Sequence, residues 1–436
     1  MKNKFLVTAI LVLRLIVFPQ DVYALPQLSD IEHGNADFVI DGNTLTITVQ
    51  TDQFIANYHS FNIAQNETVR FIQPFATSTA LNRVISGHST MITGVLTANG
   101  IIFIVNPAGI NFGPTAQINT AGLIASTLNI SSADFLAQNY VFEGQGAYIN
   151  VDQGALLTSP GGYIILFSNA IRNMGTIEAS LGKVILATGE KITLDLDPNG
   201  DISVVINGAL TAGVIGPDGE VMENSIENIG TIAADGGKII LTSEVLNGIF
   251  DKAINNTGII EATSLGEAGG EITLLAKGGN IINEGHIAAD GSTEAPDGGV
   301  IDIEADNILH QGIVSADAQE GGTAGDISIV AKDKLILDNG SLTSAAVSKP
   351  ALEGEGGNIY LNATEGDTLV RSEAVIDVSA GSEAGDAGFV EVSALEGLGF
   401  YGILKGSAAA GYTAARVLFD PRDIIIADIG IAKPQD

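Results

Sequence analysis

The sequence contains no cysteine and no tryptophan, which removes two residue types that often anchor small extracellular folds. Without cysteine, disulfide bonds and thiolate metal sites are excluded. Basic residues are also scarce, because 19 Lys and Arg stand against 51 Asp and Glu, giving a formal net charge of −32. This balance argues against nucleic-acid binding and against docking on anionic lipid. We interpret the acidic residues as a solvated surface, and calcium held between acidic loops is the alternative.

Glycine and aliphatic residues are abundant instead. The chain of 436 residues has 53 glycines, and hydrophobic residues make up 45% of it. This composition is too apolar for a disordered chain, and it is typical of many short strands joined by glycine turns. The length allows either one large core or an extended repeat.

Residues 1–24 are predicted to be a signal peptide. Lys2 and Lys4 form a basic start, Phe5–Phe18 is apolar apart from Arg14, and the segment ends in a small-x-small pattern at Ala24. A membrane-spanning helix is the alternative, but the apolar run is short for one. No other stretch approaches spanning length, so we expect no stable membrane insertion.

The carboxy-terminal half contains a repeat marked by regularly spaced glycines. Their intervals of 28, 27, 27 and 28 residues suit one three-strand coil of a parallel β-helix per repeat. We expect the glycines to form left-handed or tight corners. The equivalent positions Ile232, Ile239 and Leu241 are expected to point inward. The repeat glycines are Gly230, Gly258, Gly285, Gly312 and Gly340.

Asparagines precede several of these glycines. Asn228, Asn256 and Asn283 occupy the same place in successive repeats, so they are expected to form a hydrogen-bonded ladder, with a plain turn role as the alternative. The Gly- and Ala-rich insertions Gly291–Gly299 and Ala316–Gly325 are predicted to project as loops.

A hairpin is predicted near the amino terminus. Asp37–Ile40 and Thr44–Val49 flank an Asp-Gly-Asn turn, and threonines alternate with aliphatic residues along the second strand. A stack of repeats needs a cap at its open end, so we expect this hairpin to cover the first coil.

Catalytic signatures are scarce. The five histidines are scattered without metal-ligand spacing, and Ser126 has no Gly-x-Ser-x-Gly elbow. We therefore predict no enzyme activity, no metal site and no cofactor. The histidines are His33, His59, His88, His286 and His310.

The most distinctive block begins with Ile101–Val105, a continuous β-branched run typical of a strand buried on both faces. Asn106-Pro107-Ala108-Gly109 has the residue order of a turn, since Pro presets φ and Gly suits the fourth position. Ile110 and Phe112 restart a strand, and Gly113-Pro114 ends it.

This block resembles the amino-terminal secretion domain of filamentous-haemagglutinin-like exoproteins, the two-partner secretion family. The resemblance covers roughly residues 30–170 and rests on the whole ordered block. The chain departs from the family at Ala108, where a second Asn is usual, and it has Ala80–Val84 near the place of an upstream Asn-Pro-Asn-Leu motif. The matching residues are Asn106, Pro107, Gly109, Ile110, Phe112, Gly113, Ala116, Gly122, Leu123, Ala125, Ser126 and Thr127.

The resemblance and the repeat together imply an all-β fold, a right-handed parallel β-helix with an amino-terminal β cap. Residues 25–170 would be the secretion domain, 171–420 the β-helical repeats, and 421–436 a short tail or a truncation. The implied secretion motif is Asn106, Pro107, Ala108, Gly109 and Ile110. The implied supporting residues are Phe112, Gly113, Gly122, Leu123, Ala125, Ser126 and Thr127.

The resemblance further implies a partner, an outer-membrane transporter with periplasmic recognition domains. The protein would pass through the periplasm to the cell surface or the extracellular space and act there as an adhesin or haemagglutinin-like protein. A host-cell or glycan receptor would then be a further partner. The alternative is a glycan-binding or glycan-cleaving β-helix exported by another route.

Overall fold

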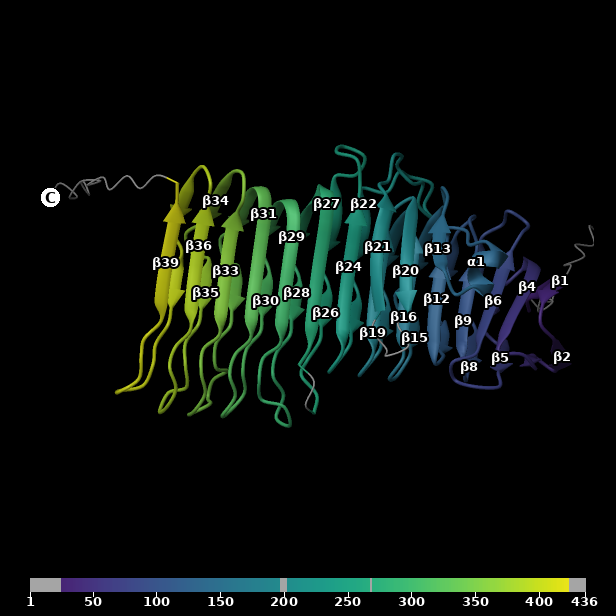
Figure 1. Ribbon diagram of the computed structural model, residues 1–436, viewed down its shortest axis with the longest axis horizontal. Coiled ribbons are helices and arrows are strands. Elements are labelled where there is room, and N and C mark those ends of the chain that lie inside the picture. The colour runs from purple at the N-terminus through teal and green to yellow at the C-terminus, as the bar shows by residue number, and fades with distance from the viewer. Residues whose placement is uncertain (1–24, 197–201, 267–268, 423–436) are drawn as a thin grey trace, which may run out of the picture.

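The computed structural model describes residues 25–196, 202–266 and 269–422. The predicted signal peptide, and residues 423–436 of the predicted tail, lie outside these described residues. The described chain winds into a long stack of coils whose strands lie side by side along one axis (Figure 1). Parallel pairing between successive coils builds a 22-stranded and a 14-stranded sheet, and a separate 3-stranded sheet lies outside the stack. The predicted all-β parallel β-helix is therefore confirmed.

Each coil contributes strands to three faces of the stack. The first face contains β4 (Gln53–Ser60), β6 (Thr79–Val84), β9 (Ile101–Val105), β12 (Gly122–Ser126), β16 (Tyr163–Ser168), β19 (Lys183–Thr188), β24 (Lys238–Glu244), β33 (Asn358–Ala363), β36 (Phe389–Ala394) and β39 (Arg416–Pro421). The second face contains β7 (Thr90–Ile92), β10 (Ile110–Phe112), β14 (Tyr148–Val151), β17 (Ala170–Asn173), β22 (Asn224–Asn228), β25 (Lys252–Asn256), β34 (Asp367–Val370) and β37 (Leu398–Phe400).

Three long strands run across both of these faces without a break. They are β27 (Glu271–Asn283), β29 (Val300–His310) and β31 (Asp326–Leu337). The third face contains β3 (Thr44–Val49), β5 (Thr68–Ile72), β8 (Val95–Ala98), β11 (Gln117–Asn119), β15 (Leu156–Thr158), β18 (Thr176–Glu178), β23 (Thr231–Ala233), β26 (Ile259–Glu261), β28 (His286–Ala288), β30 (Ile313–Ser315), β32 (Leu342–Ser344), β35 (Val375–Asp377) and β38 (Ile403–Lys405).

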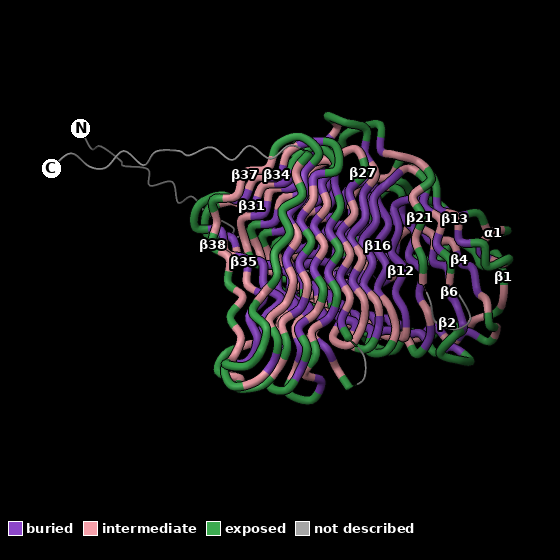
Figure 2. Tube along the Cα trace, turned by 60° about the vertical axis from the view of Figure 1, so that its left-hand side comes forward, coloured by how far each residue is buried: buried purple, intermediate pink, exposed green. Residues whose placement is uncertain are grey.

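The core is a column of aliphatic side chains inside the coils. Buried residues alternate with partly exposed ones along many strands (Figure 2). Ile232, Ile239 and Leu241 are fully buried, as the repeat predicts. Ile239 lies level with Val184 on one side and with Ile272 on the other, so like residues stack along the axis. The hydrophobic effect of burying these stacked side chains is the main interaction that holds one coil on the next.

Most of the repeat positions require glycine for a different physical reason from the one expected. A Cβ on Gly230 would lie 2.1 Å from the carbonyl oxygen of Gly175, and one on Gly258 would lie 2.2 Å from that of Gly230. Gly285 and Gly312 face the same obstacle, so these corners need glycine because consecutive coils approach closely. Only Gly340 among the repeat glycines has the expected left-handed backbone, with φ at +81°.

The predicted asparagine ladder is confirmed and is longer than predicted. Asn228 Nδ2 donates to Asn256 Oδ1, and Asn256 Nδ2 donates to Asn283 Oδ1, each at 2.8 Å. Asn173 extends the ladder at one end through a 2.8 Å bond to Asn228. At the other end Asn283 Nδ2 lies 3.3 Å from Nδ1 of His310. The ladder satisfies polar groups that are almost completely buried.

The amino-terminal end is capped as predicted. β2 (Ala36–Asp41) pairs with β3 in an antiparallel hairpin, and β1 (Gln27–His33) pairs antiparallel with β4. The predicted loops at 291–299 and 316–325 lie between the strands of successive coils.

The sequence did not predict a second layer outside the first face. This layer consists of α1 (Ser132–Leu136) and the antiparallel strands β13 (Tyr140–Glu143), β20 (Lys191–Leu196) and β21 (Ile202–Gly208). It packs on outward apolar residues such as Phe103, whose ring makes an edge contact with Phe135 at 5.1 Å between centroids. Among the described residues, α1 is short, and no helix has the length and hydropathy of a membrane span.

Ile239→Asp is expected to unfold the central coils. A carboxylate at this fully buried position has no partner, and burying an unpaired charge costs several kcal/mol. Ile229→Asp is the matched control, because Ile229 is 46% exposed and the change should cost no more than about 0.5 kcal/mol. Thermal melting followed by circular dichroism compares the two variants, and equal melting of Ile239→Asp and the parent would show that the assigned register is wrong.

The end of the asparagine ladder makes stability dependent on pH. His310 accepts from Asn283 through Nδ1 and donates through Nε2 to the carbonyl of Leu342 at 3.1 Å, so the neutral ring fits and the imidazolium does not. Burial lowers the pKa of His310 to about 4, against the opposing effect of its hydrogen bonds. The unfolded chain therefore binds this proton first, and the stability due to neutral His310 is present above pH 6.5 and is lost as pH falls towards 4.

His310→Asn is expected to remove that acid lability, because Asn continues the ladder with a group that does not titrate. The difference between variant and parent should grow by up to about 3 kcal/mol between pH 6.5 and pH 4. Asp317 has the opposite effect in both proteins. Burial raises the pKa of its carboxyl to about 6, so its protonation stabilises the folded state as pH falls. Melting curves of both proteins across this range measure the difference, and parallel curves would contradict the neutral-ring assignment.

Candidate functional site

The predicted secretion motif forms the corner between the first and second faces, where β9 turns into β10. Asn106 closes this turn twice, since its Oδ1 accepts from the Ala108 N–H and its carbonyl accepts from the Gly109 N–H, each at 3.0 Å. Gly109 has φ at +114°, a conformation that favours glycine. The structure thus has a turn at the residues where the sequence predicts one.

The Asn106 side chain also reaches beyond its own turn. Its Nδ2 donates to the carbonyl of His88 and to Oγ1 of Thr90, both at 2.9 Å, in the preceding coil. Its backbone N–H donates to the carbonyl of Ser126 in the following coil at 2.9 Å. With 1% of its surface exposed, Asn106 joins three successive coils. Nothing local in the sequence indicates the two bonds to the preceding coil.

Backbone groups of the turn make similar links between coils. The Gly109 carbonyl accepts from the Thr90 N–H, and the Pro107 carbonyl accepts from the Ala147 N–H, both at 2.9 Å. The turn therefore has hydrogen-bonded neighbours on both sides along the axis. Its geometry depends on the coils around it, and theirs depends on the turn.

Polar residues continue this corner through the next coils. Thr127 lies one position beyond the pair Val105–Ser126, level with Asn106, and its Oγ1 lies 2.8 Å from Oγ of Ser168. The same column continues through Thr188 to Ser243, which are joined at 2.9 Å. From Ala276 onward the column is occupied by alanine, at Ala276, Ala305, Ala331, Ala363 and Ala394. The hydrogen-bonded corner is thus a feature of the amino-terminal coils.

The supporting residues are buried parts of the same coils. Phe112 and Leu123 belong to the main core cluster, and the Ser126 hydroxyl donates to the carbonyl of Leu128 at 2.9 Å. Within the motif itself, only Pro107 is exposed, and Ala108 is partly exposed. The buried supporting residues are Phe112, Gly113, Gly122, Leu123, Ala125, Ser126 and Thr127.

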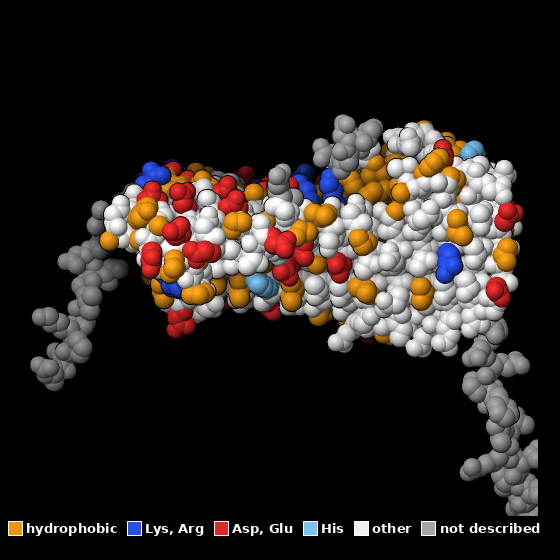
Figure 3. All heavy atoms as spheres, turned by 90° about the horizontal axis from the view of Figure 1, so that it is seen from below, with side chains coloured by type: hydrophobic (Ala, Val, Ile, Leu, Met, Phe, Trp, Pro, Cys, Tyr) orange, Lys and Arg blue, Asp and Glu red, His pale blue; other side chains and the backbone are white. Residues whose placement is uncertain are grey.

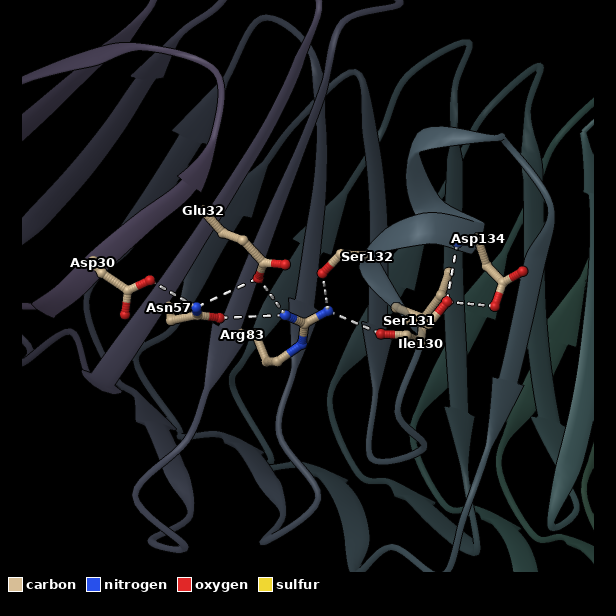
Figure 4. A network of polar contacts seen from close by, with 8 residues as sticks. All are labelled: Asp30, Glu32, Asn57, Arg83, Ile130, Ser131, Ser132 and Asp134. Carbon is tan, nitrogen blue, oxygen red and sulfur yellow. Dashed lines mark hydrogen bonds and ion pairs between the residues drawn. The ribbon is translucent and has the colours of Figure 1, made fainter.

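A polar cluster centred on Arg83 ties the amino-terminal cap to the outer layer (Figure 4). Arg83 Nη1 contacts Glu32 of β1 at 3.1 Å and Oδ1 of Asn57 at 3.3 Å. Its Nη2 donates to the carbonyl of Ile130 at 2.9 Å and to the hydroxyl of Ser132 at 3.3 Å, at the start of α1. Hydrogen bonding by Ser132 and the charge of Arg83 lower the pKa of Glu32, although burial acts in the opposite direction. The sequence predicted none of these contacts.

Elsewhere, charged residues link neighbouring coils, and a groove beside the outer layer is lined by Lys183, Asp195, Lys238 and Glu271. Arg172 pairs with Glu227 at 2.7 Å, and Arg371 pairs with Asp338 at 2.8 Å, each across coils. Acidic side chains gather over the carboxy-terminal coils on the face seen in Figure 3. Across the described ranges, no cluster of at least three His, Asp or Glu side chains has the geometry to hold a metal ion.

A parallel β-helix with an antiparallel cap, an outer layer and this corner motif defines the secretion domain of an exported exoprotein. The chain belongs to the TPS secretion domain family, whose sequence model matches residues 25–289. This confirms the family that the motif suggested. Proteins of this family are two-partner secretion exoproteins, exported through the periplasm to the cell surface or the extracellular space.

Solved and curated relatives agree with this assignment. The crystal structure of the HMW1 secretion domain from Haemophilus influenzae matches with a TM-score of 0.71 and 29% identity, over 91% of this chain and 100% of that chain. Two heme/hemopexin-binding proteins of Haemophilus influenzae are 29% and 27% identical, over 60% and 56% of this chain. The matched region spans only 28% and 27% of the length of those relatives.

Proposed function

We propose that this chain is exported through a cognate outer-membrane transporter whose periplasmic domains recognise it, and that it folds outside the cell. The match to the TPS secretion domain family supports export through such a transporter. The coil architecture supports the folding step, because each coil that emerges buries its aliphatic residues on the one before it. Formation of each new coil makes retreat through the transporter less favourable.

We propose a structural role for the secretion motif within this process. The observation that carries the proposal is the Asn106 side chain, which is buried and bonds to the coil before its own. In the folded chain only Pro107 and Ala108 of the motif reach the surface, so direct reading of Asn106 by the transporter would have to occur before the chain folds. The motif would thus act by fixing the corner that aligns the first coils, and not as a contact surface.

The domain boundaries predicted at residues 170 and 420 stay predictions. The family match continues to residue 289, and the stack of coils runs across residue 170 without interruption through β17. For the exported protein we propose a non-enzymatic surface role, such as adhesion or haemagglutination, with a host-cell or glycan receptor as partner. The heme/hemopexin-binding relatives support ligand binding as a role compatible with this family.

Three variants separate a structural motif from a recognition motif. Asn106→Ala should cost about 2–4 kcal/mol, since it removes three side-chain hydrogen bonds, one of them to the fully buried Thr90. Gly109→Val should cost about 1–3 kcal/mol, because a β-branched residue is strained at φ +114°. Ala108→Lys is the control, since it alters the reachable surface of the turn and leaves the buried contacts in place.

Secreted protein and melting midpoint are to be measured for all three variants, with transporter levels held equal. A structural motif predicts that export falls in step with stability for Asn106→Ala and Gly109→Val, while Ala108→Lys exports normally. Loss of export in Asn106→Ala or in Ala108→Lys at an unchanged melting midpoint would show instead that the transporter reads the motif directly. Normal export of all three would reject any secretion role for the motif.

A further inference from the structure

A groove of about 1040 Å³ runs between the first face of the stack and the outer layer. One side of it is a column of residues that lie level on successive strands of the first face. Tyr163, Lys183, Lys238 and Glu271 are neighbours in this column, on β16, β19, β24 and β27. Ile101 begins the column on β9, so it advances by five strand spacings, or about 24 Å, along the axis.

The opposite side of the groove belongs to the outer layer. Asp195 and Leu196 of β20 and Ile202 of β21 line it. The corner between the two sides consists of glycines, because a Cβ on Gly182 or Gly237 would lie 2.1 Å from a carbonyl oxygen of the coil before. These corners have no side chains that would fill the groove.

Two lysines lie side by side in the column, in a chain with only 19 basic residues. Lys183 and Lys238 are level on neighbouring strands, an arrangement in which like charges repel. Lys238 Nζ pairs with Glu271, and the two side chains are 30% and 42% exposed. With Asp195, the described lining has two lysines and two carboxylates. The groove therefore presents hydrogen-bond donors and acceptors side by side, without an excess of either charge.

Leu181 lines the groove from a backbone conformation that disfavours it. Its φ is +56°, whereas the equivalent residues of the coils before and after are Gly161 at +69° and Gly236 at +63°. A glycine would relieve this strain, yet a leucine that is 59% exposed occupies the position. Backbone strain of this kind is concentrated at functional sites, so the exposed leucine favours a role in ligand contact.

We propose that this groove binds a neutral oligosaccharide that lies along the axis of the stack. Sugar rings have apolar faces that suit Tyr163, Leu181 and Leu196, and their hydroxyl groups can both donate to carboxylates and accept from lysines. Asp195 and Glu271 would repel an anion, the lysines would repel a cation, and a purely apolar ligand would desolvate all four charges. The inference rests on the proposed surface role, for which it names the class of receptor.

Two variants alter different parts of the groove, each with a matched control. Leu181→Gly removes the apolar side chain and relieves the strained backbone, so binding should weaken while the melting midpoint changes little. Gln138→Gly is its control, because Gln138 has φ at +57° and lies outside the groove. Lys238→Ala removes a donor. Its control is Lys332→Ala, because Lys332 is also paired with a glutamate but lies in β31, which does not line the groove.

Binding to the full secreted chain is to be measured by isothermal titration with neutral oligomers of glucose, galactose, mannose and N-acetylglucosamine, and with oligogalacturonate as the acidic comparison. At least one neutral series should bind, more tightly with each added ring until the groove is filled. Both groove variants should weaken this binding about tenfold, and both controls should bind like the parent. Binding by no neutral series, preference for oligogalacturonate, or unchanged binding by both folded groove variants would overturn the proposal.

Adhesion of cells to the purified chain is to be measured in parallel, which separates this proposal from the surface role. The proposal predicts that the groove variants lose adhesion and the controls keep it. Adhesion that both groove variants retain would leave the surface role intact and would overturn the groove as its receptor site. Sugar binding at the groove without any adhesion of cells would support the site and count against the surface role alone.

Discussion

The spacing between successive coils is the constraint on which the rest of the structure depends. Parallel pairing sets this spacing at about 4.7–4.9 Å along the whole stack. At that distance the residue at every corner must fit against the backbone of the corners in the coils before and after it. Glycine meets the requirement at Gly230 and Gly258, where a Cβ would strike a carbonyl oxygen of the preceding coil. Asparagine meets it differently, by donating to the next asparagine along the axis.

The same constraint explains why the secretion motif is so specific in sequence while so little of it is exposed. Asn106 occupies a corner where the coil before, its own turn and the coil after all present polar backbone groups. The Asn106 side chain, with one acceptor and two donor hydrogens, satisfies the groups of its own turn and of the coil before, and its backbone N–H satisfies the coil after. In later coils the level positions are alanine, such as Ala276 and Ala305, and the corner is closed without side-chain hydrogen bonds. At this corner the side-chain hydrogen bonds are thus confined to the earlier coils, whereas the later coils are joined by polar side chains at the asparagine ladder.

Local patterns made much of the fold predictable. Threonines alternating with aliphatic residues predicted the hairpin of β2 and β3, the turn residues predicted the corner after β9, and the glycine interval predicted the length of one coil. Contacts that depend on which coil lies next were beyond such patterns. Asn173 bonds to Asn228 although 55 residues separate them, because the outer strands β20 and β21 interrupt the repeat. The contacts of His310 and Arg83 were not predicted for the same reason, since their partners come from other coils.

The central claim is that the motif is an interior corner of the stack and not an exposed loop. Hydrogen–deuterium exchange of the secreted chain, read by mass spectrometry, measures this directly, because amides bonded between coils exchange only when the coils open. Peptides covering residues 106–111 should be protected as strongly as those covering β12. They should exchange far more slowly than those covering the loop at 408–411, whose amides donate no backbone hydrogen bonds. Exchange of 106–111 as fast as that loop, in a chain whose β12 remains protected, would contradict the account.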